Sequence, residues 1–106
     1  MEKKNDNLKK QKIEIELLSW NYINSKRIIE ETQDDIIPCN YERLKSHLRI
    51  VKHIENVARC MSDKERIIIQ NEVIEGKTGK WYLEYFSAPS YYRHRKKAYT
   101  DFLDCL

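Results

Sequence analysis

The sequence predicts an all-α protein, and three observations indicate this class. The chain of 106 residues contains only two glycines and two prolines, so few positions interrupt a helix. Ile, Leu, Lys, Glu and Arg are abundant, and this composition favours long helices over a β fold with many turns. Apolar residues also recur at spacings of three and four, which is the period of an amphipathic helix. A chain of this length can form a core without metal or disulfide bonds.

The first helix is predicted over residues 8–32, which contain no glycine or proline. One apolar stripe is expected to carry Ile13, Leu17, Trp20 and Ile28, widened by Leu18, Tyr22 and Ile29. The helix should end in residues 33–38, because the residue before Pro38 is pushed out of the α region. We predict that the stripe faces the core; a dimer seam or a partner-binding face is the alternative.

The second helix is predicted from about Asn40, as N-cap, to near Cys60. Its apolar stripe comprises Tyr41, Leu44, Leu48, Val51 and Ala58, with Ile54, Val57 and Met61 beside it. Two long amphipathic helices joined by a short link favour an antiparallel hairpin. Residues 1–61 are therefore predicted to form an N-terminal helical hairpin that contacts a partner or a second copy.

A third helix is predicted over residues 63–75. Ser62 and Glu65 have the spacing of a capping box, in which each side chain accepts a hydrogen bond from the backbone amide of the other residue. Gly76 suits the position after the helix, where the backbone takes a positive φ. A short aromatic helix is then expected from Lys80 to Phe86.

The last helix is predicted to begin in the turn of residues 87–90, where Pro89 is tolerated in the first turn. Its inward positions, at spacings of three and four, are Tyr91, His94, Ala98 and Phe102. Its outward positions are Ala88, Ser90, Tyr92, Arg93, Lys96 and Lys97. A helix, a short helix, a tight turn and a basic helix follow the order of a helix-turn-helix. Residues 62–106 are therefore predicted to form a DNA-binding domain.

Charge is distributed unevenly along the chain. The net charge is only +3, but residues 91–100 carry Arg93, Arg95, Lys96 and Lys97 with no acid among them. Small residues at the start of the last helix, followed by basic ones, suit close approach to base edges and then phosphate contact. An ordinary solvated helix face is the alternative interpretation.

The C-terminal part also resembles a known family. Residues 61–66, Met-Ser-Asp-Lys-Glu-Arg, resemble the "L-P/S-x-x-E-R" opening of sigma-factor region 4. The spacing of Ser87, Tyr91, His94, Ala98 and Phe102 is similar to that of the recognition helix of this module. Residues 87–98 also resemble the "S-x-S-T-Y-Y-R-x-(R/K)-K-x-A" signature of ArpU-type phage regulators and of small sigma-like proteins of mollicutes. The aromatic segment before Ser87 departs from the usual "L-x-E-I-A" pattern.

This resemblance, over residues 61–106, implies a three-helix, sigma region 4-like helix-turn-helix and a role in transcription. Double-stranded DNA and RNA polymerase are the implied partners. The residues implied near base edges are Ala88, Ser90, Tyr92 and Arg93, and those nearer phosphates are Arg95, Lys96 and Lys97.

Other classes of function lack their usual signals. His47 and His53 lie six residues apart on different sides of a helix, so they do not form a metal site. Gly76 and Gly79 lack the spacing and the preceding strand of a phosphate-binding loop. We therefore expect no enzyme activity, no metal or other cofactor and no small-molecule ligand.

The cysteines and the lengths of the apolar runs indicate the cellular compartment in which the protein is expected. Cys39, Cys60 and Cys105 are odd in number and widely spaced, which favours free thiols in a reducing compartment. No apolar run approaches the ~20 residues that a membrane-spanning helix needs. A cytoplasmic protein is expected.

Two hypotheses about function follow. The first is a sequence-specific transcriptional regulator that acts with RNA polymerase, its N-terminal hairpin contacting polymerase or another copy of the chain. The alternative, suggested by the low net charge and the two long apolar stripes, is a helical protein–protein interaction module without DNA binding, such as an adaptor or an anti-activator.

Overall fold

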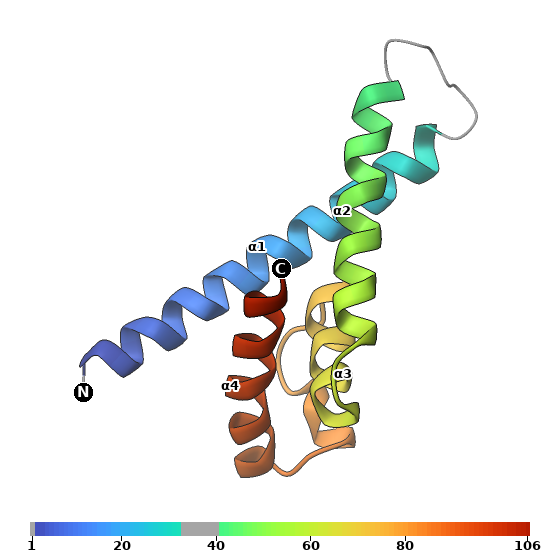
Figure 1. Cartoon of the computed structure of the whole chain (residues 1–106). Coiled ribbons are helices and arrows are strands. Elements are labelled where there is room, and N and C mark those ends of the chain that lie inside the picture. Colours follow the sequence, from blue (N-terminus) through green and yellow to red (C-terminus); the bar gives the residue numbers. More distant parts are fainter. Residues whose placement is uncertain (1, 33–40) are drawn as a thin grey trace.

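The structure, a computed structural model, is all-helical, as the sequence predicts (Figure 1). It describes the backbone of residues 2–32 and 41–106 and the side chains of residues 8–32 and 42–106. The elements in chain order are α1 (Glu2–Thr32), α2 (Tyr41–Arg59), α3 (Asp63–Ile69), the π-helix η2 (Gln70–Ile74), the 3-10 helix η3 (Trp81–Glu84) and α4 (Ala88–Cys105). The proposed N-cap Asn40 and the break at residues 33–38 lie outside the described residues.

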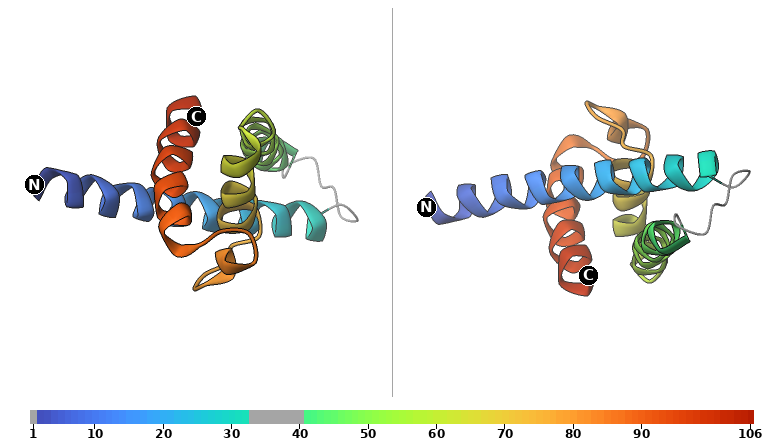
Figure 2. Two further views of the ribbon diagram at one scale, coloured as in Figure 1. Left: turned by 90° about the horizontal axis from the view of Figure 1, so that it is seen from below. Right: turned by 90° about the horizontal axis from the view of Figure 1, so that it is seen from above.

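The long helix α1 connects the other elements. It crosses α2 obliquely and continues past it to η2 and α4 (Figures 1 and 2). Ser25 Oγ lies 2.9 Å from His47 Nδ1 on α2, and Gln11 Nε2 donates to Thr100 Oγ1 of α4 at 3.0 Å. The first two helices therefore contact one another over only part of their length, and the other half of α1 packs on the C-terminal segment.

The inner face of α1 differs from the predicted one. The buried positions, spaced by three and four residues, are Ile15, Ser19, Tyr22 and Ser25. Ile13, Leu17 and Trp20 are 55%, 57% and 64% exposed, so the prediction that their stripe faces the core is wrong. Only the wider set, Leu18, Tyr22 and Ile29, joins the core. On this face α1 approaches Gly76 closely: a Cβ added to Gly76 would lie 2.7 Å from Ile23 Cδ1 and 3.4 Å from Ser19 Oγ.

The second helix packs much as its pattern predicts. Val51, Ile54 and Ala58 are buried together with Met61, which follows the helix. Leu48, which the sequence places in the stripe, is 46% exposed. Its neighbour His47, which is half-buried, is the residue that contacts Ser25 of α1.

The third helix begins at the predicted residue, but without the predicted capping box. Ser62 is the N-cap residue, yet its side chain makes no capping hydrogen bond. Glu65 is buried, and its carboxylate lies 3.5 Å from Lys97 Nζ. The predicted capping box is therefore wrong, because the Glu65 carboxylate pairs with α4 and does not turn back to Ser62. The helix also changes to π geometry over Gln70–Ile74 before it ends at Gly76, whose φ of 64° confirms the predicted terminus.

The aromatic segment forms only the short 3-10 helix η3, shorter than predicted, whereas α4 begins at Ala88 as expected. One apolar cluster joins residues of both predicted domains, from Ile15 and Tyr22 of α1 to Phe102 of α4. The division at residue 62 stays a prediction. Within the described residues, we find no helix with the length and apolar character needed to cross a bilayer.

Candidate nucleic-acid interface

Helix α4 is fixed along its inner face. Ser87 Oγ accepts a hydrogen bond from Ser90 N at 3.4 Å, and Pro89 lies in the first turn. Of the predicted inward positions, Tyr91, Ala98 and Phe102 are buried, and Tyr99 joins them. His94 is half-buried, with its ring centre 5.7 Å from that of Phe86, as expected for a packing residue. The inward face of the last helix is therefore as predicted.

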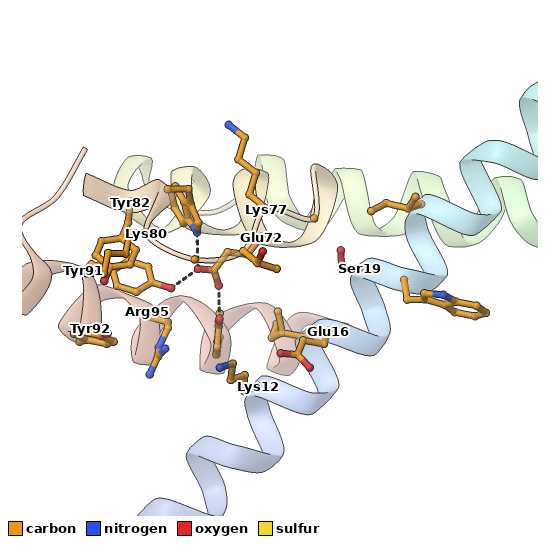
Figure 3. Close-up of a pocket in the computed structure, with 18 residues that line it drawn as sticks. Lys12, Glu16, Ser19, Glu72, Lys77, Lys80, Tyr82, Tyr91, Tyr92 and Arg95 are labelled. Atoms are coloured by element: carbon orange, nitrogen blue, oxygen red, sulfur yellow. Dashed lines mark hydrogen bonds between the residues drawn. The ribbon is translucent and has the colours of Figure 1, made fainter. Parts of the chain in front are cut away.

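A single carboxylate holds this face in place. Glu72, in the π-helix, accepts hydrogen bonds from Trp81 Nε1 at 3.1 Å and from the hydroxyl groups of Tyr91 and Tyr99 (Figure 3). Burial, together with the neighbouring Glu72 carboxylate, raises the pKa of both tyrosines well above the usual range. The hydroxyl groups therefore remain protonated donors at neutral pH. Glu72 thus ties η2, η3 and α4 together.

Aromatic rings complete the attachment of η3 to α4. The rings of Tyr82 and Tyr91 are stacked, with centroids 3.8 Å apart and planes within 3°. Trp81 meets the edge of Tyr91 at a centroid distance of 5.8 Å. Such contacts add to the free energy of burying the rings. The start of α4 is consequently held by packing as well as by its N-cap.

The outer face of α4 is basic. Tyr92, Arg93, Lys96 and Lys97 are exposed, and no acid occurs in this helix before Asp101. Lys97 is paired with Glu65, although its side chain is 71% exposed. Among the described residues, neither Arg93 nor Lys96 forms an ion pair. The first half of α4 lies at the end of the molecule remote from α1 (Figure 1).

The remaining predicted site residues are less accessible. Ala88 and Ser90 are half-buried, and Ala88 packs against the core. The Arg95 guanidinium lies 4.9 Å from the ring centre of Tyr92 and 5.7 Å from that of Tyr91. Arg95 therefore covers the tyrosines, and its guanidinium is less free for a phosphate than the side chains of Arg93 and Lys96.

A cavity of about 590 Å³ lies between α1 and the first half of α4 (Figure 3). Its walls are α1, the loop of residues 76–80, η3 and α4, and the charged residues that line it are Lys12, Glu16, Glu72, Lys77, Lys80 and Arg95. Glu72 already accepts three hydrogen bonds there. Sequence reasoning missed Glu72 as an anchor because no signal in the neighbouring residues indicates its role; the tyrosines that contact it are 19 and 27 residues away.

The described part of the chain contains no group of three His, Cys, Asp or Glu side chains that could hold a metal ion. His47 contacts Ser25, whereas His53 Nε2 lies 3.4 Å from the carbonyl oxygen of Leu106. Cys60 and Cys105 are exposed free thiols, and Cys39 lies outside the described residues. Comparison of the chain with protein families, with curated proteins and with solved structures finds no match.

Proposed function

We propose that this protein is a sequence-specific DNA-binding transcriptional regulator that acts with RNA polymerase, and that α4 is its recognition helix. The observation that carries the proposal is the acid-free outer face of α4, on which Tyr92, Arg93 and Lys96 are exposed at one end of the molecule. The major groove of DNA, about 12 Å wide, admits one α-helix. A basic helix face that is exposed to solvent is accessible to such a groove.

The chemistry of α4 supports a division of roles along the helix. Its N-terminal end carries the positive end of the helix dipole, which attracts phosphate. Tyr92 and Arg93, in the first two turns, are placed to reach base edges, and Lys96 lies one turn further toward the phosphates. The order agrees with a recognition helix, whose N-terminal residues contact the bases.

The support of α4 departs from an ordinary helix-turn-helix. The short 3-10 helix η3 stands where the module has a full α-helix. Glu72 and the stacked Tyr82 and Tyr91 rings supply the rigidity instead. A recognition helix needs a fixed orientation, and these contacts provide it without the second helix.

Fluorescence anisotropy of the full chain against a random AT-rich duplex pool, at two salt concentrations, tests the proposal. The double variant Arg93→Ala/Lys96→Ala should bind more than tenfold more weakly at low salt. Because Lys96 is the phosphate contact of the two, the salt slope should also fall by about 0.9, the amount that one lost phosphate contact removes. The matched control, Arg49→Ala/Lys52→Ala, removes two exposed cations from α2 and should leave affinity nearly unchanged.

Equal losses in both double variants would mean that only net charge matters and would refute α4 as the recognition helix. Salt-sensitive binding that survives Arg93→Ala/Lys96→Ala would refute it as well. Absence of binding at low salt would favour the second candidate, a protein–protein interaction module without DNA binding. The observation that favours this alternative is the exposed Ile13, Leu17 and Trp20 on α1.

A further inference from the structure

The outer face of α1 is apolar without being covered by the rest of the chain. Ile13, Leu17 and Trp20 are each more than half exposed and are spaced by four and then three residues. At 3.6 residues per turn, this row lies on the side of the helix opposite to Ile15 and Ser19, which are buried. Single exposed apolar residues are ordinary, but a row of three large ones at seam spacing indicates a contact surface.

We propose that this row is the seam of a homodimer in which α1 pairs with α1 of a second copy as a short parallel coiled coil. In heptad terms Ile13 and Trp20 occupy d positions and Leu17 an a position. The next a position is Asn24, which is half-buried. A single asparagine at an a position is a known determinant of register in two-stranded coiled coils.

Charges beside the seam favour the parallel orientation. In the same register Lys9 falls at a g position and Glu14 at the following e position, and both are exposed. A parallel dimer brings each g residue beside the e residue of the next heptad on its partner, so two Lys9–Glu14 pairs form across the seam. Lys10 occupies the a position before Ile13, and its charge ends the seam on that side.

The position of α1 in the molecule leaves room for a second copy. Seen from above, α1 crosses in front of α4, while α2 stands beside it and is seen nearly end-on (Figure 2). Trp20 also borders the cavity shared with the loop of residues 76–80, whereas the core residues Ile15 and Tyr22 lie on the opposite side of α1. Because the seam faces away from this side, two copies meet without a collision of their cores. The seam spans only residues 13–24, so a reversible dimer is expected.

Sedimentation equilibrium of the full chain over a range of concentrations tests the dimer. The wild type should show reversible, concentration-dependent dimerisation, and Leu17→Glu should remain monomeric at every concentration with unchanged helical circular dichroism. Leu48→Glu is the matched control: Leu48 is a similarly exposed leucine, but on α2. It should dimerise as the wild type does. A monomeric wild type, or equal behaviour of the two glutamate variants, would overturn the proposal.

A charge-swap series tests the orientation. Lys9→Glu and Glu14→Lys should each weaken association at low salt, because each places like charges side by side across the seam. The double swap should restore it if the helices are parallel. Failure of the double swap to restore association would exclude the parallel arrangement.

Dimerisation and DNA binding are assigned to different helices. Leu17 is exposed on α1, whereas Arg93 and Lys96 are exposed on α4. Leu17→Glu is thus expected to abolish dimerisation while basic contacts to DNA persist, and Arg93→Ala/Lys96→Ala to weaken DNA binding in a chain that still dimerises. Sedimentation of the Leu17 variant therefore tests the dimer, and anisotropy of the Arg93/Lys96 variant separately tests the recognition helix.

Discussion

At the scale of single residues, one acid determines how the candidate interface is held. Glu72 accepts from Trp81, Tyr91 and Tyr99, and the described residues contain no buried side-chain polar atom without a hydrogen-bond partner. Such a network is fully satisfied only while its central acceptor is present. Loss of the acceptor leaves buried donors without a partner, which costs more than the mean value of a hydrogen bond.

Glu72→Ala should therefore lower the free energy of unfolding by about 3 kcal/mol, since each stranded donor costs about 1–3 kcal/mol. Urea denaturation followed by circular dichroism measures it. Glu75→Ala is the control in the same segment, because Glu75 is exposed and, among the residues that the structure describes, forms an ion pair with Lys77 alone, at 3.7 Å. Exposed pairs of this kind contribute about 0–1 kcal/mol. Equal destabilisation by the two variants would contradict the role assigned to Glu72.

The tyrosines predict how stability depends on pH. Burial first, and the Glu72 carboxylate second, raise the pKa of Tyr99 far above the ordinary value of about 10. Below pH 10 both the folded and the unfolded chain keep this proton. Above it the unfolded chain loses the proton and the folded chain keeps it, so stability is full below about pH 10 and falls as pH rises further.

Tyr99→Phe removes this titrating hydroxyl group, so the folded and unfolded chains no longer differ in the number of protons bound at residue 99. Urea denaturation in alkaline buffers should show that unfolding free energy falls less steeply above pH 10 than in the wild type, by about 1.4 kcal/mol per pH unit. The variant is also expected to be less stable at neutral pH, since it loses the hydrogen bond to Glu72. The slope, and not the absolute stability, is the readout. A slope equal to that of the wild type would contradict the raised pKa.

At the scale of elements, local sequence signals predicted where helices begin and end better than which faces they bury. Gly76 and the turn before α4 act within a few residues, so their effect can be seen in the sequence. The inner face of α1 cannot be identified in this way. Two faces of that helix carry apolar residues at helical spacing, and Leu17 and Trp20 lie on the exposed one although both side chains are large.

Tertiary contacts decided between these faces. Ser19 and Ser25 make the inner face narrow enough for close packing, and Ser25 finds His47 as its hydrogen-bond partner. A tertiary contact also explains why the predicted capping box does not form. Glu65 has the right spacing to cap, but its carboxylate pairs with Lys97 on a helix more than 30 residues later. Of the candidate site, the basic face of α4 was predictable from its pattern, whereas the anchoring role of Glu72 depended on partners far along the chain.

At the scale of the whole molecule, α1 completes the core of the segment that carries the basic helix. Ile15 and Tyr22 of α1 belong to the same apolar cluster as Ile69, Val73 and Phe102. Gln11 also reaches Thr100 on α4. A fragment of residues 62–106 lacks the part of this cluster that α1 and α2 contribute, although its own helix signals are intact.

This arrangement predicts that the fragment does not fold by itself. Its circular dichroism should show reduced helicity, and urea should unfold it gradually, whereas the full chain at the same concentration should give one cooperative transition. The physical reason is that small segments bury too little apolar surface to offset the chain entropy lost on folding. Cooperative unfolding of the fragment with native-like helicity would instead establish residue 62 as a true domain boundary. In that case α1 would be an added layer, free to serve its partner without supporting α4.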